Sequence, residues 1–381
     1  MAAHHPVVIV GSGYAGLQLA RQFRRHAPAT PLVIVCADEG ADYPKPQLSH
    51  AISKRQSAAD LIRKSAKEIA LELKALLLTG QQVKAIDPER QVIQLAEREL
   101  PYRDLVLAVG AEAWVPPVSG DAANEIITLN SLQEYQLHQE RLTNSQRILL
   151  IGAGLIGCEL ANDFLLAGKQ VTICDPADSL LNALLPGFTS EKLQTVLTQA
   201  GCQFELMNTL KSAEKVADGI RATFSNGNPI TVDSIVCAAG LRPRTALAKA
   251  AGLPVNRGIV VDETLATSDP HIYALGDCAE IAGQLLPYLQ PITVSAQVLA
   301  KTLAGEQTAV QWPVMPVNVK TSSYPVQLAG EVRSEDLIWQ LDEDENGLIG
   351  LAFRHDKLVG FVTCGQHTTR SMTLIKQLAE N

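Results

Sequence analysis

A glycine-rich turn that follows an apolar run occurs twice in this chain and constrains its fold more than any other feature. The first copy, GSGYAG, occupies residues 11–16, and the second, GAGLIG, occupies residues 152–157. Each turn follows a β-rich run, residues 7–10 or residues 148–151, and leads into a helical segment. The first glycine permits a tight bend, the second lets the backbone approach a pyrophosphate, and the third lets the helix pack on the strand. One copy alone can be merely a tight turn, whereas the repeat predicts two dinucleotide-binding units.

The free N–H groups at the start of each predicted helix are suited to binding phosphates. In the first unit, the predicted cofactor-binding residues of the turn are Gly11, Ser12, Gly13, Tyr14, Ala15 and Gly16. In the second unit, they are Gly152, Gly154, Leu155, Ile156 and Gly157. The repeat is a duplicated supersecondary unit rather than the period of a solenoid.

A carboxylate at the end of the second strand of such a unit accepts hydrogen bonds from the adenosine ribose. In the second unit, Asp175 directly follows the predicted strand of residues 170–174. We expect Asp175 to bind the ribose 2′-hydroxyl and to repel a 2′-phosphate, so that NADH is preferred over NADPH. In the first unit, Cys36 follows the run and Asp38 comes two residues later. We expect Asp38 at the ribose; the alternative is an exposed loop acid.

Composition and charge exclude several classes of protein. The formal net charge of −8 opposes binding to nucleic acid or to an anionic membrane surface. No apolar run approaches the roughly 20 residues that span a bilayer. The first residues contain neither a basic segment nor a cleavage site of a signal peptide. We therefore expect a cytoplasmic protein without membrane insertion.

The cysteines form neither C-x-x-C nor C-x-x-x-x-C pairs. They are Cys36, Cys158, Cys174, Cys202, Cys237, Cys278 and Cys364. Such an odd, scattered set argues against a disulfide framework, a metal site and a redox-active dithiol. We expect most of them to be small buried hydrophobic residues.

Five motifs in a fixed order resemble those of one enzyme family. They are GSGYAG, LVLAVG, GAGLIGCE, AAGLRP and YALGDCAE, and they span most of the chain. Together they resemble the pyridine-nucleotide oxidoreductases with glutathione-reductase-like architecture. More narrowly, the strings YPKPQLS, GLRPRTALA, VNRGIVVD and MPVNVKT resemble those of bacterial rubredoxin–NAD reductases.

The resemblance implies a flavoprotein that passes electrons from NADH through non-covalent FAD to rubredoxin, which supplies an alkane hydroxylase. It implies FAD contacts at residues 12–15, Ala37, Asp38, Lys45, Val83, Glu159, Asp277, Leu289 and Lys320. The oligomeric state is left open, with a monomer favoured.

Two charged residues have alternative interpretations. Lys45 lies between two prolines, which restrict its backbone and could present it to the flavin ring. The alternative is an ordinary surface lysine. Glu159 either caps the start of its helix or points across the domain junction towards the flavin.

Two loops that follow strands carry further candidates. Gly240 and Arg242 follow the predicted strand of residues 230–239 and could lie beside the nicotinamide, its ribose or a phosphate. The alternative is a plain turn. Asp277 follows a glycine after the strand of residues 272–275 and can accept a hydrogen bond from a ribityl hydroxyl.

The patterns predict an α/β fold with two Rossmann-like domains, for FAD and NAD, and a small α+β C-terminal domain. The predicted domains are FAD-binding at 1–112 and 245–312, NAD-binding at 113–244 and C-terminal at 313–381. Within them, residues 60–78 are expected to form one helix.

Hydride transfer to the flavin requires no side-chain nucleophile, so we predict no catalytic side chain. Lys45 and Lys320 are expected to give electrostatic support to the reduced flavin. An acidic rubredoxin requires a local basic patch, for which Lys45, Lys54, Arg55 and Lys320 are candidates.

Two other functions remain open. One is a reductase for a ferredoxin or for the rubredoxin-like domain of a nitric-oxide-reducing flavoprotein. The other is a flavin-bearing interaction or sensor protein that uses NADH to change its conformation, with negligible turnover.

Overall fold

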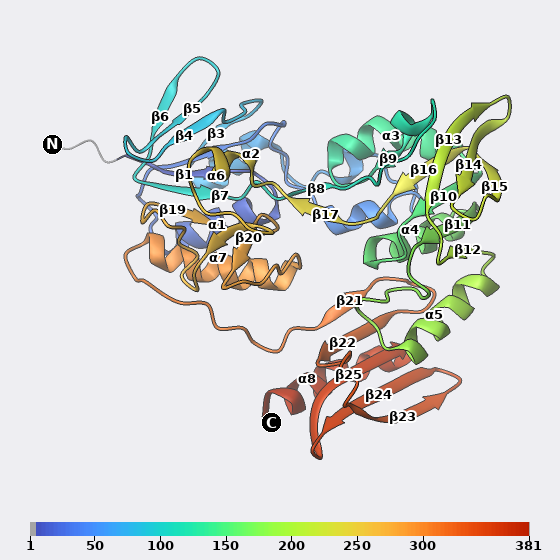
Figure 1. Ribbon diagram of the computed structural model, residues 1–381. Coiled ribbons are helices and arrows are strands. Elements are labelled where there is room, and N and C mark those ends of the chain that lie inside the picture. The colour runs from blue at the N-terminus through green and yellow to red at the C-terminus, as the bar shows by residue number, and fades with distance from the viewer. Residues whose placement is uncertain (1–4, 381) are drawn as a thin grey trace. The chain divides into compact units, whose positions relative to one another are not determined.

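The computed structural model describes residues 5–380 of the chain (Figure 1). The chain divides into two compact units. Unit 1 comprises Met1–Pro44, Asp60–Glu112 and Leu241–Trp312, and unit 2 comprises Lys45–Ala59, Ala113–Gly240 and Pro313–Asn381. The predicted NAD-binding and C-terminal domains thus share unit 2, and the division into three domains stays a prediction.

Unit 1 is built on a five-stranded parallel sheet in the order β19-β7-β1-β2-β3. Its elements are β1 (Val7–Val10), α1 (Tyr14–His26), β2 (Leu32–Val35), β3 (Leu76–Leu78), β7 (Asp104–Leu107), β19 (Ile272–Ala274) and α7 (Leu289–Leu303). Strands β1 and β2 are buried throughout, as expected when helices cover both faces of a parallel sheet. Helices α1 and α7 contact each other (Figure 1), and the hydroxyls of Tyr14 and Thr293 lie 3.0 Å apart.

The glycine turn of unit 1 lies where the order of this sheet reverses. Strand β1 has β2 on one side and β7 on the other. Ligands of open α/β sheets bind at such a switch point, beyond the carboxyl ends of the strands.

Unit 2 repeats this arrangement in the parallel sheet β12-β11-β10-β16-β9. Its elements are β9 (Ile127–Thr128), α3 (Leu132–Asn144), β10 (Arg147–Ile151), α4 (Leu155–Leu166), β11 (Gln170–Asp175), α5 (Gly187–Gln199), β12 (Gln203–Leu206) and β16 (Ser234–Cys237). An antiparallel sheet of β13 (Leu210–Val216), β14 (Gly219–Phe224) and β15 (Pro229–Val232) follows β12 along the chain.

The C-terminal part of unit 2 is an antiparallel sheet in the order β21-β22-β25-β24-β23 (Figure 1). Its elements are β21 (Val317–Val319), β22 (Val326–Gly330), β23 (Ile338–Asp344), β24 (Gly347–Arg354), β25 (Lys357–Gly365), η4 (Gln366–Arg370) and α8 (Ser371–Glu380). Helix α8 contacts β22 and β25, and Phe361 and Leu374 are buried in the core they share.

The remaining elements are short. They are η1 (Lys45–His50), η2 (Ala59–Leu61), α2 (Ala66–Leu73), β4 (Ala85–Asp87), β5 (Val92–Gln94), β6 (Glu99–Pro101), β8 (Ala111–Ala113), η3 (Ala123–Glu125), β17 (Leu241–Pro243), α6 (Ala246–Ala250), β18 (Ile259–Val261) and β20 (Ala279–Ile281). No helix of the described chain is both long and apolar enough to cross a membrane.

Two predicted elements are wrong, although the α/β fold is confirmed. Residues 60–78 are not one helix, because the Ser65 capping box starts α2 and the left-handed Lys74 ends it. Residues 230–239 are not one strand, because β15 and β16 belong to different sheets. Asp233 separates them and accepts hydrogen bonds from the backbone N–H groups of Gln146 and Arg147.

Candidate functional site

The glycines of the first turn let the strand, the turn and the helix approach one another more closely than residues with a Cβ would. A Cβ on Gly11, whose φ is +116°, would lie 2.2 Å from the carbonyl oxygen of Ala108. A Cβ on Gly16 would lie 2.0 Å from the carbonyl oxygen of Gly11. A Cβ on Gly13, by contrast, would meet nothing within 4 Å. Gly13 is thus open to a group that approaches from outside the protein, as a pyrophosphate does in this motif.

The second glycine turn has the same geometry. A Cβ on Gly152 would lie 2.5 Å from the carbonyl oxygen of Ala238, and one on Gly157 would lie 1.9 Å from the carbonyl oxygen of Gly152. A Cβ on Gly154 would meet nothing within 4 Å. Both turns therefore leave the same middle position open, at the start of α1 and of α4.

The structure brings several predicted residues of unit 1 together around the first turn. The Ser12 hydroxyl donates a long hydrogen bond of 3.4 Å to Asp38, which also accepts one of 2.9 Å from the backbone N–H of Gly40. Asp38 is itself exposed. Gly276 lies against the turn as well, because a Cβ on it would be 2.7 Å from the Ala15 Cβ.

The other predicted FAD residues of unit 1 lie on separate segments. Asp277 is half-buried in the loop after β19, and Leu289 is the first residue of α7 and 40% exposed. Val83 is half-buried between β3 and β4, and Ala37 is exposed after β2. Their contacts with FAD stay a prediction.

Asp175 lies at the end of β11, as predicted, and binds the second glycine turn. Its carboxylate accepts hydrogen bonds of 2.7 Å from the backbone N–H groups of Ala153 and Ala177. The first of these bonds holds the carboxylate against the predicted phosphate-binding loop. Gly240 and Arg242 are exposed, the former with a φ of +119°.

Helix α4 carries a buried carboxylate that connects two segments far apart in the sequence. Glu159 is 2% exposed and accepts hydrogen bonds from the Ser49 hydroxyl at 2.8 Å and from the Lys320 backbone N–H at 3.0 Å. Since both donors lie outside α4, the interpretation of Glu159 as a helix cap is wrong. Lys45 is half-buried at the start of η1, whereas Lys320 is exposed.

Two further polar residues of α4, Asn162 and Asp163, make similar connections and were missed in the sequence. Asp163 is 1% exposed and accepts hydrogen bonds of 3.1 Å from the backbone N–H groups of Ile52 and Ser53, and another from the Ser53 hydroxyl. Burial raises the pKa of Asp163. The Asn162 amide donates to the Ser322 hydroxyl at 3.0 Å. The available signal was an amide and two carboxylates in an otherwise apolar helix, LIGCELANDFLL.

Comparison with known proteins decides the family. Residues 5–302 match the profile of the pyridine nucleotide-disulphide oxidoreductases, and residues 309–378 match that of a rubredoxin binding C-terminal domain. The chain belongs to the pyridine nucleotide-disulphide oxidoreductase family. As in this family, FAD and NAD(H) are its cofactors, and the open middle glycines of the two turns, Gly13 and Gly154, leave space that fits their pyrophosphates.

Curated relatives of this oxidoreductase match it over nearly its whole length. The nitric oxide reductase FlRd-NAD(+) reductase of Vibrio vulnificus is 44% identical over 376 residues, which cover 98% of each chain. Its counterpart in Escherichia coli O157:H7 is 44% identical over 373 residues, again 98% of each chain. These relatives confirm the predicted resemblance to rubredoxin–NAD reductases and fit the flavorubredoxin alternative better than the alkane pathway.

Solved structures share the fold of this oxidoreductase. A ferredoxin reductase from Rhodopseudomonas palustris matches with a TM-score of 0.89 and 24% identity, covering 98% of this chain and 95% of its own. The covalent putidaredoxin reductase–putidaredoxin complex matches with a TM-score of 0.89 and 25% identity, covering 99% and 94%.

The thiols of this oxidoreductase are unsuited to redox relay. All seven cysteines are buried and free. Burial raises the pKa of each thiol, to about 11 for Cys36 and Cys278. A thiol with so high a pKa stays protonated at neutral pH and is a poor nucleophile. The prediction that the cysteines are buried hydrophobic residues is confirmed.

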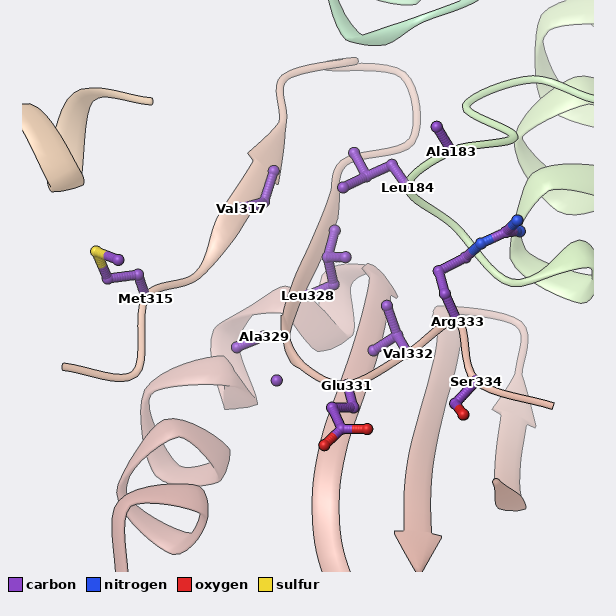
Figure 2. Close-up of a pocket in the computed structure, with 11 residues that line it drawn as sticks. Ala183, Leu184, Met315, Val317, Leu328, Ala329, Glu331, Val332, Arg333 and Ser334 are labelled. Carbon is purple, nitrogen blue, oxygen red and sulfur yellow. The ribbon is translucent and has the colours of Figure 1, made fainter. Parts of the chain in front are cut away.

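A cavity of about 370 Å³ lies elsewhere in unit 2, beside the C-terminal sheet (Figure 2). Leu184, Val317 and Leu328 are among its apolar lining residues, and Arg333 donates a hydrogen bond of 3.0 Å to the carbonyl oxygen of Leu185. None of the predicted cofactor residues lines it, so we assign it no cofactor.

The middle and last glycines of the first turn have separable roles. Gly13→Ala is expected to leave the melting temperature of the flavin-free protein unchanged and to weaken FAD binding about tenfold, or 1.4 kcal/mol. Gly16→Ala is expected to lower that melting temperature, because overpacking costs about 1–3 kcal/mol. Thermal melts and FAD titrations measure both; equal effects of the two variants would contradict this division.

Asp175 is expected to select NADH through its charge. Asp175→Asn keeps an acceptor for the Ala153 N–H and removes the charge that opposes a 2′-phosphate, so the kcat/KM preference for NADH over NADPH should narrow by about tenfold. Asp175→Ala also leaves the Ala153 N–H without this acceptor, so it should weaken the binding of both NADH and NADPH. An unchanged preference in Asp175→Asn would refute the ribose assignment.

Asp163→Ala is expected to destabilise the holoenzyme. It leaves the buried N–H of Ile52 and the half-buried N–H of Ser53 without an acceptor, at about 1–3 kcal/mol for a buried group, and the melting temperature should fall by several degrees. The exposed Asp342 of β23 gives the control, since Asp342→Ala should leave the melting temperature unchanged. Equal melting temperatures for the two variants would show that the α4 contacts contribute nothing.

Proposed function

We propose that this oxidoreductase transfers electrons from NADH to the rubredoxin-type iron centre of a nitric-oxide-reducing flavoprotein. The observation that carries this proposal is the 44% identity, over 98% of both chains, to reductases with that name. The match of residues 309–378 to a rubredoxin binding domain supports the same acceptor. Free rubredoxin is the second candidate, favoured by the same match.

The protein's part in this reaction is to bind and orient the cofactors. FAD, when bound, supplies two-electron chemistry towards NADH and one-electron chemistry towards iron. The first glycine turn and Asp38 hold the adenine dinucleotide of FAD, and the second turn and Asp175 hold that of NADH. Lys45 and Lys320 give electrostatic support to the reduced flavin.

No thiol takes part in the proposed reaction. The raised pKa values of the buried cysteines support this. We further propose the three domains as predicted, with FAD bound by the predicted residues and NAD also by Gly240 and Arg242. We place the reaction in the cytoplasm, where the NADH pool is found.

Anaerobic reduction by NADH, followed by rapid mixing with each acceptor, tests the proposal. Bleaching of the flavin absorbance by NADH should precede its return on mixing. The rubredoxin domain of a flavorubredoxin should be reduced at least about tenfold faster, as kcat/KM, than a ferredoxin, a difference of 1.4 kcal/mol. Free rubredoxin, the second candidate acceptor, is mixed with the reduced enzyme in the same way, and its kcat/KM is compared with that of the flavorubredoxin domain. A faster ferredoxin reaction would refute the proposal, and a negligible rate with every acceptor would favour the sensor.

A further inference from the structure

One face of helix α4 holds two turns that are distant in the sequence. Glu159, Asn162 and Asp163 are spaced i, i+3 and i+4, so their side chains lie on the same side of the helix. Asp163 accepts hydrogen bonds from the turn at residues 51–55, and Asn162 binds the turn at residues 320–323.

Each turn is bonded at more than one point. In the second turn, the Lys320 N–H donates to Glu159 at 3.0 Å and the Ser323 N–H donates to Asn162 at 3.3 Å. The first turn is also held by α3 on its C-terminal side. There the Tyr135 hydroxyl donates to the carbonyl oxygen of Gln56 at 2.7 Å. All of these contacts lie within unit 2.

The two turns display cations. Lys54, Arg55 and Lys320 are exposed, and in the described part of the chain none of them forms an ion pair. Burial is the main cause that lowers the pKa of His50. The charges of Lys54 and Lys320 lower this pKa further, so both lysines lie near His50.

The neighbouring carboxylates do not cancel this charge at the surface. Glu159 and Asp163 are 2% and 1% exposed, and both oxygens of each carboxylate accept hydrogen bonds from Ser49 or from the two turns. In a chain with a net charge of −8, exposed cations without ion-pair partners on two adjacent, firmly held turns form a local positive surface.

We propose that the turns at residues 51–55 and 320–323 form one docking surface for an acidic, rubredoxin-type iron protein, held in place by α4. The surface therefore extends beyond the matched rubredoxin binding domain, residues 309–378, to Lys54 and Arg55. The inference rests on the proposed function and adds the position and chemistry of the docking surface. Asp163 is a positioning residue, because it holds the backbone that carries Lys54.

Charge complementarity is the argument for this partner. Electron-transfer complexes have small interfaces in which opposite charges steer the encounter and fix the orientation. Loops held by buried hydrogen bonds lose little conformational freedom on binding, so a few cations on such loops suffice for a transient complex.

The holoenzyme variant Lys54→Glu/Arg55→Glu tests the surface, with the purified rubredoxin domain of a flavorubredoxin as acceptor. At low salt, the KM for this acceptor should rise about tenfold, and the difference from the wild type should vanish near 0.5 M salt. Reduction of the flavin by NADH and turnover with ferricyanide should stay unchanged. Lys320 is left intact, because we assign it to the flavin as well.

The variant Lys357→Glu/Lys376→Glu is the matched control. Both lysines are exposed in the C-terminal domain, and the variant changes the net charge by the same amount. Its KM for the rubredoxin domain should stay within about twofold of the wild type if only local charge matters. An equal rise in both double variants, or no rise in the first, would overturn the docking surface.

Asp163→Asn tests the positioning role with less risk to folding than Asp163→Ala. It should raise the KM for the rubredoxin domain and flatten its salt dependence, with the ferricyanide rate unchanged. An unchanged KM in a variant with a lowered melting temperature would assign Asp163 to stability alone. If the wild type reduces no rubredoxin-type protein, the proposed function fails; if it does and the Lys54→Glu/Arg55→Glu variant matches it, only the docking inference fails.

Discussion

The close approach of a helix to the strand before it is the constraint on which both nucleotide units depend. A Cβ on Gly16 would lie 2.0 Å from the carbonyl oxygen of Gly11, and a Cβ on Gly157 would lie 1.9 Å from that of Gly152, so only glycine permits this approach. With the helix this close, its first N–H groups face the point where the sheet reverses its order. The open middle glycines, Gly13 and Gly154, then leave room for a phosphate group.

A second constraint comes from polar groups buried in an otherwise apolar helix. A carboxylate removed from water requires hydrogen-bond donors, and α4 buries two, Glu159 and Asp163. Their donors come from residues 49–53 and from Lys320 rather than from the helix itself. The need to satisfy these carboxylates therefore determines where both segments lie within unit 2.

These two constraints serve different parts of the proposed reaction. In that proposal the glycine turns bind and orient the adenine halves of FAD and NAD(H), and similar turns can serve many acceptors. The polar face of α4 instead positions turns that carry exposed cations. With the proposed docking surface, acceptor choice changes through a few surface charges and the nucleotide turns stay the same.

The sequence by itself determined the two dinucleotide units, because a G-x-G-x-x-G turn acts through a local steric requirement. It also determined the place of Asp175, since a strand end can be read from a run of apolar residues. It did not determine that residues 230–239 divide between two sheets, because two short runs of strand-forming residues on either side of Asp233 do not state which neighbour each pairs with. Only the tertiary structure decided the roles of Glu159, Asn162 and Asp163, because their donors lie more than a hundred residues away along the chain.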